Sequence, residues 1–250
     1  MLVLEKWHSI GNDFLISKTE LEPSKIAEIC DRKFGIGADQ FVLIQEDRIR
    51  FFNQDGTEAE ICGNAMKCIT KLLYEETGLI EFNLKTKKGE VKCNIDKEGF
   101  SVINLGKALE FKEIDDGIYV NLGNPHLIIF YEPNKELDDE LVKTKGLELQ
   151  KKFPQTNGIN VSFVQVLNKQ KLLVRTFERG VGETLSCGSG SCASFVASQK
   201  MGLIEGEVKV FNKGSKKVLA FKESYHLISF NSENVILKGK GTKVAEVKIY

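Results

Sequence analysis

The sequence predicts an α+β protein of two related halves, in each of which a curved sheet encloses one buried helix. A Cys-Gly element occurs at Cys62 and again at Cys187, half a chain length apart in a chain of 250 residues. Short stretches that alternate apolar and polar residues surround each element. The stretch after each one is apolar on most sides, which is typical of a buried helix. A chain of this length suits two domains that each bury a core.

The first half is predicted to combine strands with two helices. The alternating pattern predicts strands at Leu2–Lys6, Gln40–Gln45, Ile49–Asn53, Ile80–Lys85 and Gly89–Ile95. Helical periodicity predicts helices at Pro23–Lys33 and Ala65–Glu76. The second helix is expected to end at Gly78, because glycine readily adopts the left-handed conformation that closes many helices.

The second half is predicted to repeat this layout. Strands are expected at Ile118–Asn121, His126–Tyr131, Val161–Val166, Leu172–Phe177, Gly206–Asn212, Lys217–Phe221, His226–Asn231 and Val235–Tyr250. The charged segment Pro133–Lys152 is expected to be partly helical and to supply an outer helix. A buried helix is expected at Gly190–Met201, closed by Gly202.

The boundary between the two domains is expected near Glu113–Asp116, where the first set of strands ends in an acidic turn. The N-terminal domain, residues 1–115, would carry Cys62, and the C-terminal domain, residues 116–240, would carry Cys187. A last strand at about 241–250 is expected to return to the first domain.

Composition excludes several classes of function. The 35 basic and 35 acidic residues cancel, so the chain has no net field to attract nucleic acid or a lipid membrane. The first residues lack the pattern of a signal peptide, and no apolar run approaches the roughly 18 residues that span a bilayer. We therefore expect a cytoplasmic protein that acts on a small molecule. A homodimer is compatible with the sequence.

The cysteines do not suggest a zinc site. The chain has six cysteines and three histidines, and the cysteines form no Cys-x-x-Cys pair. A cytoplasmic setting also disfavours structural disulfides. Cys30, Cys68, Cys93 and Cys192 are expected to pack in the core. No glycine loop of the phosphate-binding type follows a strand, so neither a metal nor a cofactor is expected.

The expected chemistry follows from a cysteine at the start of each buried helix. The first turn of a helix presents N–H groups and a partial positive charge, which is expected to lower the pKa of the thiols toward neutrality. The same N–H groups can bind a substrate carboxylate. Two such helix starts on one carboxylate would hold the α-carbon of an amino acid between two sulfurs. One thiolate would then remove the α-proton while the other thiol protonates the opposite face. Alternatively, each Cys-Gly pair would only make a tight turn.

Several further motifs, in order along the chain, resemble those of a known family. They are Gly11-Asn12-Asp13-Phe14, Gly37-Ala38-Asp39-Gln40, Asn53-Gln54-Asp55-Gly56, Cys62-Gly63-Asn64, Gly123-Asn124-Pro125-His126, Asn160-Val161, Glu178-Arg179-Gly180, Gly182-Glu183-Thr184 and Cys187-Gly188-Ser189. Together they resemble the diaminopimelate epimerase family from Gly11 to Cys192. The resemblance implies two pseudo-symmetric domains, each a β-barrel around a central helix. It also implies a cofactor-independent interconversion of LL- and meso-diaminopimelate, on the bacterial route to lysine and cell-wall peptide.

The resemblance implies roles for particular residues. Cys62 and Cys187 match the two catalytic acid/base thiols, and His126 and Glu178 match the residues that support them. The main-chain cradle for the α-carboxylate is matched by Gly63 and Asn64 on one side and by Gly188 and Ser189 on the other. The substrate-contacting positions are matched by Asn12, Gln40, Asn53, Asn124, Asn160, Glu178 and Arg179.

These residue types suit a substrate with two amino-acid ends. Arg179 can hold a distal carboxylate with its forked guanidinium, and Glu178 can receive a distal ammonium. Taken singly, each residue also has a structural interpretation. Asn53 and Asn124 are ordinary turn residues, and His126 could be a buried strand histidine.

The sequence departs from the family pattern at four positions. The departures lie at Ser9, Ala65, Lys67 and Ser186, and none removes a thiol or a charge from the expected site.

Alternative functions are a two-cysteine racemase for another amino acid, such as histidine or a thioether analogue of diaminopimelate, and a non-catalytic amino-acid-binding or redox protein with a disulfide between the two thiols. The isomerase branch that shares the fold lacks the cysteine pair. A Cys–His hydrolase would leave one thiol without a role.

Overall fold

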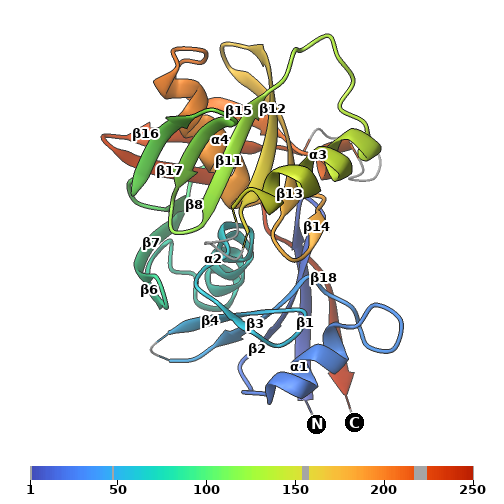
Figure 1. The fold of residues 1–250 in the computed structure, drawn as a ribbon. Coiled ribbons are helices and arrows are strands. Elements are labelled where there is room, and N and C mark those ends of the chain that lie inside the picture. The colour runs from blue at the N-terminus through green and yellow to red at the C-terminus, as the bar shows by residue number, and fades with distance from the viewer. Residues whose placement is uncertain (1, 47, 154–157, 217–223, 250) are drawn as a thin grey trace. The chain divides into compact units, whose positions relative to one another are not determined.

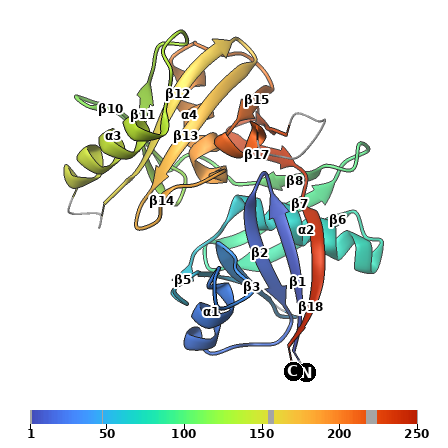
Figure 2. The same cartoon turned by 90° about the vertical axis from the view of Figure 1, so that its right-hand side faces the viewer.

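The computed structural model describes residues 2–46, 48–153, 158–216 and 224–249. The chain divides into two compact units, which we call unit 1 (residues 1–104 and 238–250) and unit 2 (residues 105–237). Both are rich in strands and contain few helices (Figures 1 and 2). Among the described residues, no helix is long and apolar enough to cross a membrane.

Unit 1 contains a main sheet and a smaller set of strands. The main sheet has the order β18-β1-β2-β3-β4-β5, and the smaller set has the order β6-β7-β8. The strands are β1 (Leu2–Ser9), β2 (Asn12–Ser17), β3 (Gln40–Ile44), β4 (Ile49–Asn53), β5 (Glu58–Ala59), β6 (Glu81–Thr86), β7 (Gly89–Ile95), β8 (Ser101–Asn104) and β18 (Thr242–Ile249). The helices are α1 (Pro23–Cys30) and α2 (Gly63–Thr77).

Helix α2 is the buried centre of unit 1. It packs against β1 and β2 of the main sheet and against β7 and β8 of the smaller set. Ala65, Met66 and Ile69 have no exposed surface, because the helix is covered on several sides. The helix ends at Gly78 in the left-handed conformation, with φ 71°. Through Ile26, helix α1 packs in an apolar cluster with Leu15, Phe41 and Leu43 of the main sheet.

Unit 2 contains one sheet in the order β17-β16-β15-β13-β12-β11-β10-β9, and β14 pairs with β13. The strands are β9 (Glu110–Ile114), β10 (Gly117–Asn121), β11 (Pro125–Phe130), β12 (Asn160–Asn168), β13 (Lys171–Glu178), β14 (Gly182–Glu183), β15 (Val208–Phe211), β16 (His226–Asn231) and β17 (Asn234–Gly239). The helices are α3 (Asp139–Lys151), α4 (Gly188–Lys200) and the 3₁₀ helix η2 (Lys213–Lys216).

A topological repeat relates the two units. The order β1-β2-α1-β3-β4-β5-α2 in unit 1 matches the order β10-β11-α3-β12-β13-β14-α4 in unit 2. In both, the first two strands are antiparallel, the strands flanking the first helix are parallel, and the last strands are antiparallel. Each buried helix therefore follows the same sequence of elements, which is the internal repeat that the two Cys-Gly elements indicate.

The two faces of the β12–β13 pair carry different residues. Successive residues of a strand point to opposite faces. Phe163 and Phe177 join the apolar cluster that includes Val142 and Leu149 of α3. Ser162 and Thr176, one residue away, lie instead at α4, since a Cβ added to Gly190 would be 2.6 Å from Thr176 Oγ1 and 3.0 Å from Ser162 Oγ. One strand pair thus supplies both an apolar core and a polar surface at the start of α4.

The predicted fold class is confirmed, with sheet-rich units that each pack around a helix. The barrels implied by the resemblance are not closed, since within the described residues no sheet returns to its first strand. The helices at the two Cys-Gly elements, the outer helix α3 and most predicted strands are present within a few residues of their predicted bounds. The predicted strand Lys217–Phe221 lies outside the described residues.

The last strand returns to the first unit as expected, since β18 pairs with β1. Other features differ from the sequence-based expectations. Asn12–Ser17, Ser101–Asn104 and Glu110–Ile114 are strands that the sequence left unassigned. The predicted strand Val235–Tyr250 is two strands, β17 and β18, separated at Lys240–Gly241. Strand β9 belongs to unit 2 because it pairs with β10, so unit 2 begins at Leu105, earlier than the expected boundary near residue 115.

Gly241 allows the chain to pass close to helix α2 where it returns to unit 1. An added Cβ would lie 2.6 Å from Cys68 Cα and 2.9 Å from Cys68 N in the buried helix α2. Backbone atoms of a packed helix cannot move aside cheaply, so Gly241→Ala should lower the free energy of unfolding by about 1–3 kcal/mol. Urea unfolding measures this change. Thr242→Ala, an exposed neighbour, is the control, and equal stability of both variants would contradict the prediction.

Candidate active site

Cys62 is the N-cap residue of α2, in an extended conformation with φ −128° and ψ 113°. Its Sγ lies 3.9 Å from Asn12 Oδ1, at the start of β2. The same oxygen accepts a hydrogen bond of 3.1 Å from Asn64 Nδ2. Asn12 donates through Nδ2 to Asp39 Oδ2 at 2.8 Å, which orients its amide oxygen toward the helix start. Asn12 and Asn64 therefore lie together at the Cys62 thiol, and Asp39 fixes the orientation of Asn12.

An ionic cluster supports this arrangement in unit 1. Arg32 donates to Asp13 Oδ1 at 2.6 Å and to Asp39 Oδ1 at 2.7 Å, and Lys6 donates to Asp13 Oδ2 at 2.6 Å. Burial alone would raise the pKa of Asp13, but the bonds from Arg32 and Lys6 hold it below its ordinary value. Burial and the charge of Asp13 raise the pKa of Asp39. Arg32 and Lys6 therefore stabilise the ionised form of Asp13.

Gln40 and Asn53 form a second polar pair in unit 1. They lie directly opposite each other on β3 and β4, and Gln40 Nε2 donates to Asn53 Oδ1 at 3.2 Å. Asn53 Nδ2 donates in turn to Thr57 Oγ1 at 3.1 Å. Gln40 Oε1 is buried and has no hydrogen-bond partner within the described part of the chain. This oxygen can accept a hydrogen bond from a substrate.

Cys187 is the N-cap residue of α4 and is 5% exposed. Its Sγ accepts a hydrogen bond from the Gly190 N–H at 3.4 Å and lies 3.5 Å from Ser189 Oγ. Only glycine fits at position 190, because an added Cβ would be 3.3 Å from the sulfur and closer still to Thr176 Oγ1 and Ser162 Oγ. The thiol therefore sits directly on the first turn of the helix.

A chain of buried hydrogen-bonding groups leads away from Cys187. Ser189 Oγ lies 2.9 Å from His126 Nε2. On the other side of the imidazole, His126 Nδ1 lies 3.4 Å from Ser162 Oγ, which is 3.1 Å from Thr176 Oγ1. His126 is thus linked to the thiol through Ser189 and is oriented by two hydroxyls.

Burial has the largest effect on the pKa of Cys187 and on that of His126. Burial and the nearby charge of Glu178 raise the pKa of Cys187 well above its ordinary value, although the bonds from Ser189 and Gly190 oppose the change. The expectation of a lowered pKa at this helix start is therefore wrong for Cys187. Burial, assisted by the charge of Arg179, lowers the pKa of His126 to about 3. Near neutral pH the thiol is protonated and the imidazole is uncharged.

Glu178 and Arg179 lie at the end of β13. Thr184 Oγ1 donates a hydrogen bond to Glu178 Oε1. The Arg179 N–H donates to Asn160 Oδ1 at 2.9 Å, while Asn160 Nδ2 donates to Asn124 Oδ1 at 2.9 Å. The Arg179 side chain is exposed, whereas Asn160 is buried. The backbone of the arginine is thus anchored next to an asparagine pair.

The predicted site residues gather in two sets, one in each unit. In unit 1, contacts link Asn12 to Cys62 and Asn64, and Gln40 pairs with Asn53 on the neighbouring strand. In unit 2, contacts link Cys187 through Ser189 to His126, and Arg179 through Asn160 to Asn124, while Glu178 lies beside Cys187. Gly63 and Gly188 directly follow the two thiols. The topological repeat relates the two sets. Gln40 and Asn160 both begin the strand after the first helix of their unit, and Asn53 and Glu178 both end the next strand.

Sequence reasoning assigned no role to several polar residues that the structure brings to these sets. Ser162 and Thr176 orient His126, Asp39 orients Asn12, and Thr184 holds Glu178. A hydroxyl within a strand that is otherwise buried and apolar, such as Ser162 within β12, is a signal that could have found two of them. In residues 2–46, 48–153, 158–216 and 224–249, no group of three or more His, Cys, Asp or Glu side chains could hold a metal ion.

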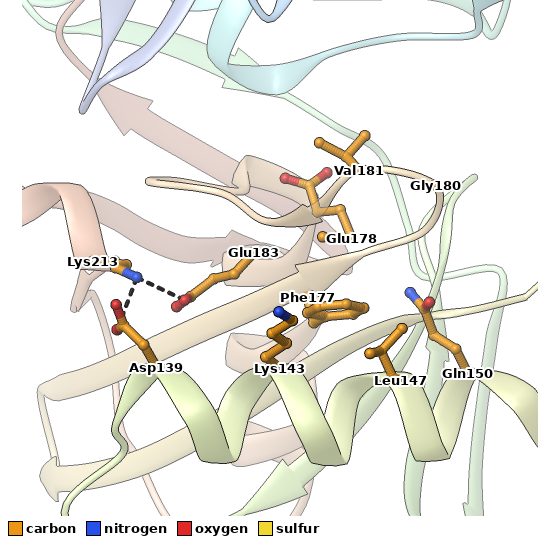
Figure 3. A pocket seen from close by; sticks show the side chains of 11 residues that line it. Asp139, Lys143, Leu147, Gln150, Phe177, Glu178, Gly180, Val181, Glu183 and Lys213 are labelled. Atoms are coloured by element: carbon orange, nitrogen blue, oxygen red, sulfur yellow. Dashed lines mark hydrogen bonds and ion pairs between the residues drawn. The ribbon is translucent and has the colours of Figure 1, made fainter.

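A cavity of about 480 Å³ lies in unit 2 between α3 and the β13–β14 hairpin (Figure 3). It is lined by Asp139, Lys143, Leu147 and Gln150 from α3, by residues 177–178 and 180–183 of the hairpin, and by Lys213. The lining does not include Cys187, Gly188 or Ser189. Glu178 is the residue that the cavity shares with the set of polar residues around the thiol.

Solved structures that resemble the chain define its class of fold. A phenazine biosynthesis protein of the PhzF family from Bacillus anthracis has a TM-score of 0.74 at 16% identity, covering 100% of this chain and 99% of that one. A probable proline racemase from Agrobacterium radiobacter, with bound carbonate, has a TM-score of 0.71 at 12% identity, covering 100% and 93%. At this identity the likeness establishes only that the chain shares the fold of these two proteins.

Sequence comparison identifies the family. The family model for diaminopimelate epimerase matches residues 6–109 and 118–237. The diaminopimelate epimerase of Rickettsia felis is 34% identical over 275 residues, covering 98% of this chain and 96% of that protein. That of Rickettsia akari is 34% identical over 274 residues with the same coverage. The chain belongs to the diaminopimelate epimerase family.

Alkylation of Cys187 should report its raised pKa. The rate of reaction with iodoacetamide, followed by peptide mass mapping, should rise about tenfold per pH unit through neutral pH and show no plateau below the ordinary thiol pKa of 9.0. Glu178→Gln removes a neighbouring negative charge, so the pKa should fall and alkylation at a given pH should become faster. A plateau near neutral pH in the unmodified protein would refute this account.

Proposed function

We propose that the protein is an isomerase that interconverts LL- and meso-diaminopimelate by proton transfer at the α-carbon, as part of lysine and peptidoglycan precursor synthesis. Membership of the diaminopimelate epimerase family supports the reaction. The observation that carries the mechanism is that Cys62 and Cys187 each cap the buried helix of their own unit. Two thiols in equivalent positions are what an enzyme needs to act on both faces of one carbon.

In the proposed reaction, one proton leaves the α-carbon and another arrives. A thiolate on one face takes the α-proton, and the electron pair of the C–H bond passes into the carboxylate as an enediolate. The thiol on the opposite face then protonates the same carbon, which inverts its configuration. The two sulfurs have exchanged protonation states, and turnover in the reverse direction restores them. The exchange balances without a cofactor.

The helix starts would stabilise the charge that develops on the carboxylate. N–H groups in the first turn of a helix have no acceptor within that helix. In this chain these groups belong to Gly63 and Asn64 in α2 and to Gly188 and Ser189 in α4. Hydrogen bonds from them strengthen as negative charge moves onto the carboxylate, so they stabilise the enediolate more than the substrate.

The surroundings of Cys187 suit alternation between acid and base. Its raised pKa keeps the thiol protonated near neutral pH, so it can act as the proton donor. When Cys187 acts as the base, Glu178 lies beside it to accept its proton, and uncharged His126 is linked to it through Ser189. The helix start therefore need not hold a permanent thiolate.

The far end of the substrate would be recognised by the polar residues at the strand ends. The exposed Arg179 can hold a distal carboxylate with two parallel hydrogen bonds. Gln40 Oε1 is a buried acceptor that a distal ammonium could satisfy. A racemase for amino acids without a second amino-acid end would have no use for these groups, so they favour diaminopimelate or its thioether analogue over substrates such as histidine. The redox alternative gives the polar residues at the strand ends no role.

Removal of either thiol should abolish epimerisation while leaving the fold intact. Cys62→Ala and Cys187→Ala should each lower turnover by at least about a hundredfold, because each removes one acid/base group. Conversion between LL- and meso-diaminopimelate, separated by chromatography, measures the inversion, and circular dichroism checks the fold. Cys93→Ala, which removes a buried thiol elsewhere, is the control. Near-normal turnover in either site variant would overturn the two-base mechanism.

Amino acids without a distal end should be very poor substrates. Alanine has no distal group to contact Arg179, Glu178 or Gln40, so its kcat/KM should be lower than that of diaminopimelate by a factor on the order of 10⁴. Arg179→Leu should narrow this gap mainly by weakening turnover of diaminopimelate. Deuterium uptake with both substrates measures the ratio. Comparable rates for alanine and diaminopimelate would disprove the proposed specificity.

A cytoplasmic location and a homodimeric assembly stay predictions. Fractionation of cells that express the tagged protein tests the first, and sedimentation velocity tests the second.

A further inference from the structure

The β13–β14 hairpin connects an ion pair on one face to Glu178 on the other. Phe177 is paired with Glu183, and Glu178 with Gly182. Figure 3 shows Glu183 and Phe177 on the side of α3 and the Glu178 carboxylate on the opposite side. Thr184, the next residue after Glu183, follows the same alternation and reaches Glu178. The position of this short strand therefore decides where the Glu178 carboxylate lies.

Glu183 is held by a buried, forked ion pair. Arg175 Nε donates to Glu183 Oε1 at 2.6 Å and Arg175 Nη2 donates to Glu183 Oε2 at 2.7 Å. The two side chains are only 9% and 10% exposed. Lys213 adds a bond of 2.8 Å to the same carboxylate, and Arg175 also binds the Leu137 carbonyl and Asp139. Two parallel bonds fix orientation as well as distance, unlike a single contact between flexible charges.

The contacts continue from the ion pair to the thiol. Thr184 donates to Glu178, and Glu178 lies close enough to Cys187 for its charge to raise the pKa of the thiol. β14 itself pairs with β13 at only two positions, Phe177↔Glu183 and Glu178↔Gly182. So short a strand has few backbone bonds of its own, and its side-chain contacts must supply the rest of its positional order.

We propose that Arg175 and Glu183 are a positioning pair for the reaction, which fixes β14 so that Thr184 holds the Glu178 carboxylate against Cys187. Neither residue touches the reacting atoms. Their effect is exerted through Thr184 and Glu178, across the hairpin. The inference rests on the proposed function for the reaction, but the contact between Glu178 and the thiol can be measured without substrate.

The test combines turnover with thiol reactivity. Glu183→Gln keeps the size of the side chain but removes its charge, and should lower kcat by between about ten- and a hundredfold with little change in KM. It should also speed alkylation of Cys187 at a given pH, as Glu178→Gln does, because the carboxylate moves away from the sulfur. In a Glu178→Gln background, Glu183→Gln should change kcat by less than a factor of about two.

Variants of Thr184 keep the proposal falsifiable if Glu183→Gln does not fold. Thr184→Val leaves the ion pair intact and should reproduce the loss of kcat and the faster alkylation. Thr184→Ser keeps the hydroxyl that donates to Glu178, so its kcat and its alkylation rate should equal those of the unmodified protein. Glu148→Gln, which breaks an exposed ion pair on α3, is the control and should change neither quantity. Arg175→Lys, which keeps the charge but not the fork, should give an intermediate loss.

Two results would overturn the proposal. One is an equal loss of kcat from Glu183→Gln in both backgrounds, and the other is unchanged alkylation of Cys187 in Glu183→Gln and Thr184→Val. Either would mean that the ion pair only stabilises the hairpin. If the unmodified protein does not turn over diaminopimelate, the proposed function fails. The alkylation measurements still decide whether the ion pair positions Glu178.

Discussion

Unit 2 depends on the alternation of side chains along β12 and β13. Phe163 and Phe177 face the apolar cluster under α3, while Ser162 and Thr176, each one residue away, face the start of α4. A slip of one residue would exchange the two faces, placing hydroxyls in the core and aromatic rings against the Cys187 thiol. The packing that stabilises the sheet and the polar surroundings of the thiol therefore share one register.

Two opposing effects act on the pKa of Cys187, and the effect of burial is the larger. The start of α4 offers a hydrogen bond from the Gly190 N–H and the positive end of the helix. Removing the sulfur from water and placing it beside Glu178 costs the thiolate more than these contacts return. A thiol that is hard to ionise alone, yet adjacent to a proton acceptor, suits an enzyme whose sulfurs must alternate between acid and base.

The sequence was sufficient for the local features of the fold and of the candidate site. Periodicity located α2 and α4, and the motifs located the thiols at their starts, because caps and helices depend on neighbouring residues. The orientation of Asn12 by Asp39, and of His126 by Ser162, depends on strands that are adjacent in space but distant in sequence. The raised pKa of Cys187 was missed for the same reason, since burial is set by the whole unit.

Because β18 pairs with β1, the two units are completed at different times during synthesis. Unit 2 is one continuous segment, so its described strands and helices are available once the end of β17, residue 239, has been made. Unit 1 begins first but is completed last, because its edge strand β18 comes from residues 242–249. Until then the edge of β1 is exposed, and an unpaired edge invites association with other chains. The segment made first thus needs protection for longest while the chain emerges from the ribosome.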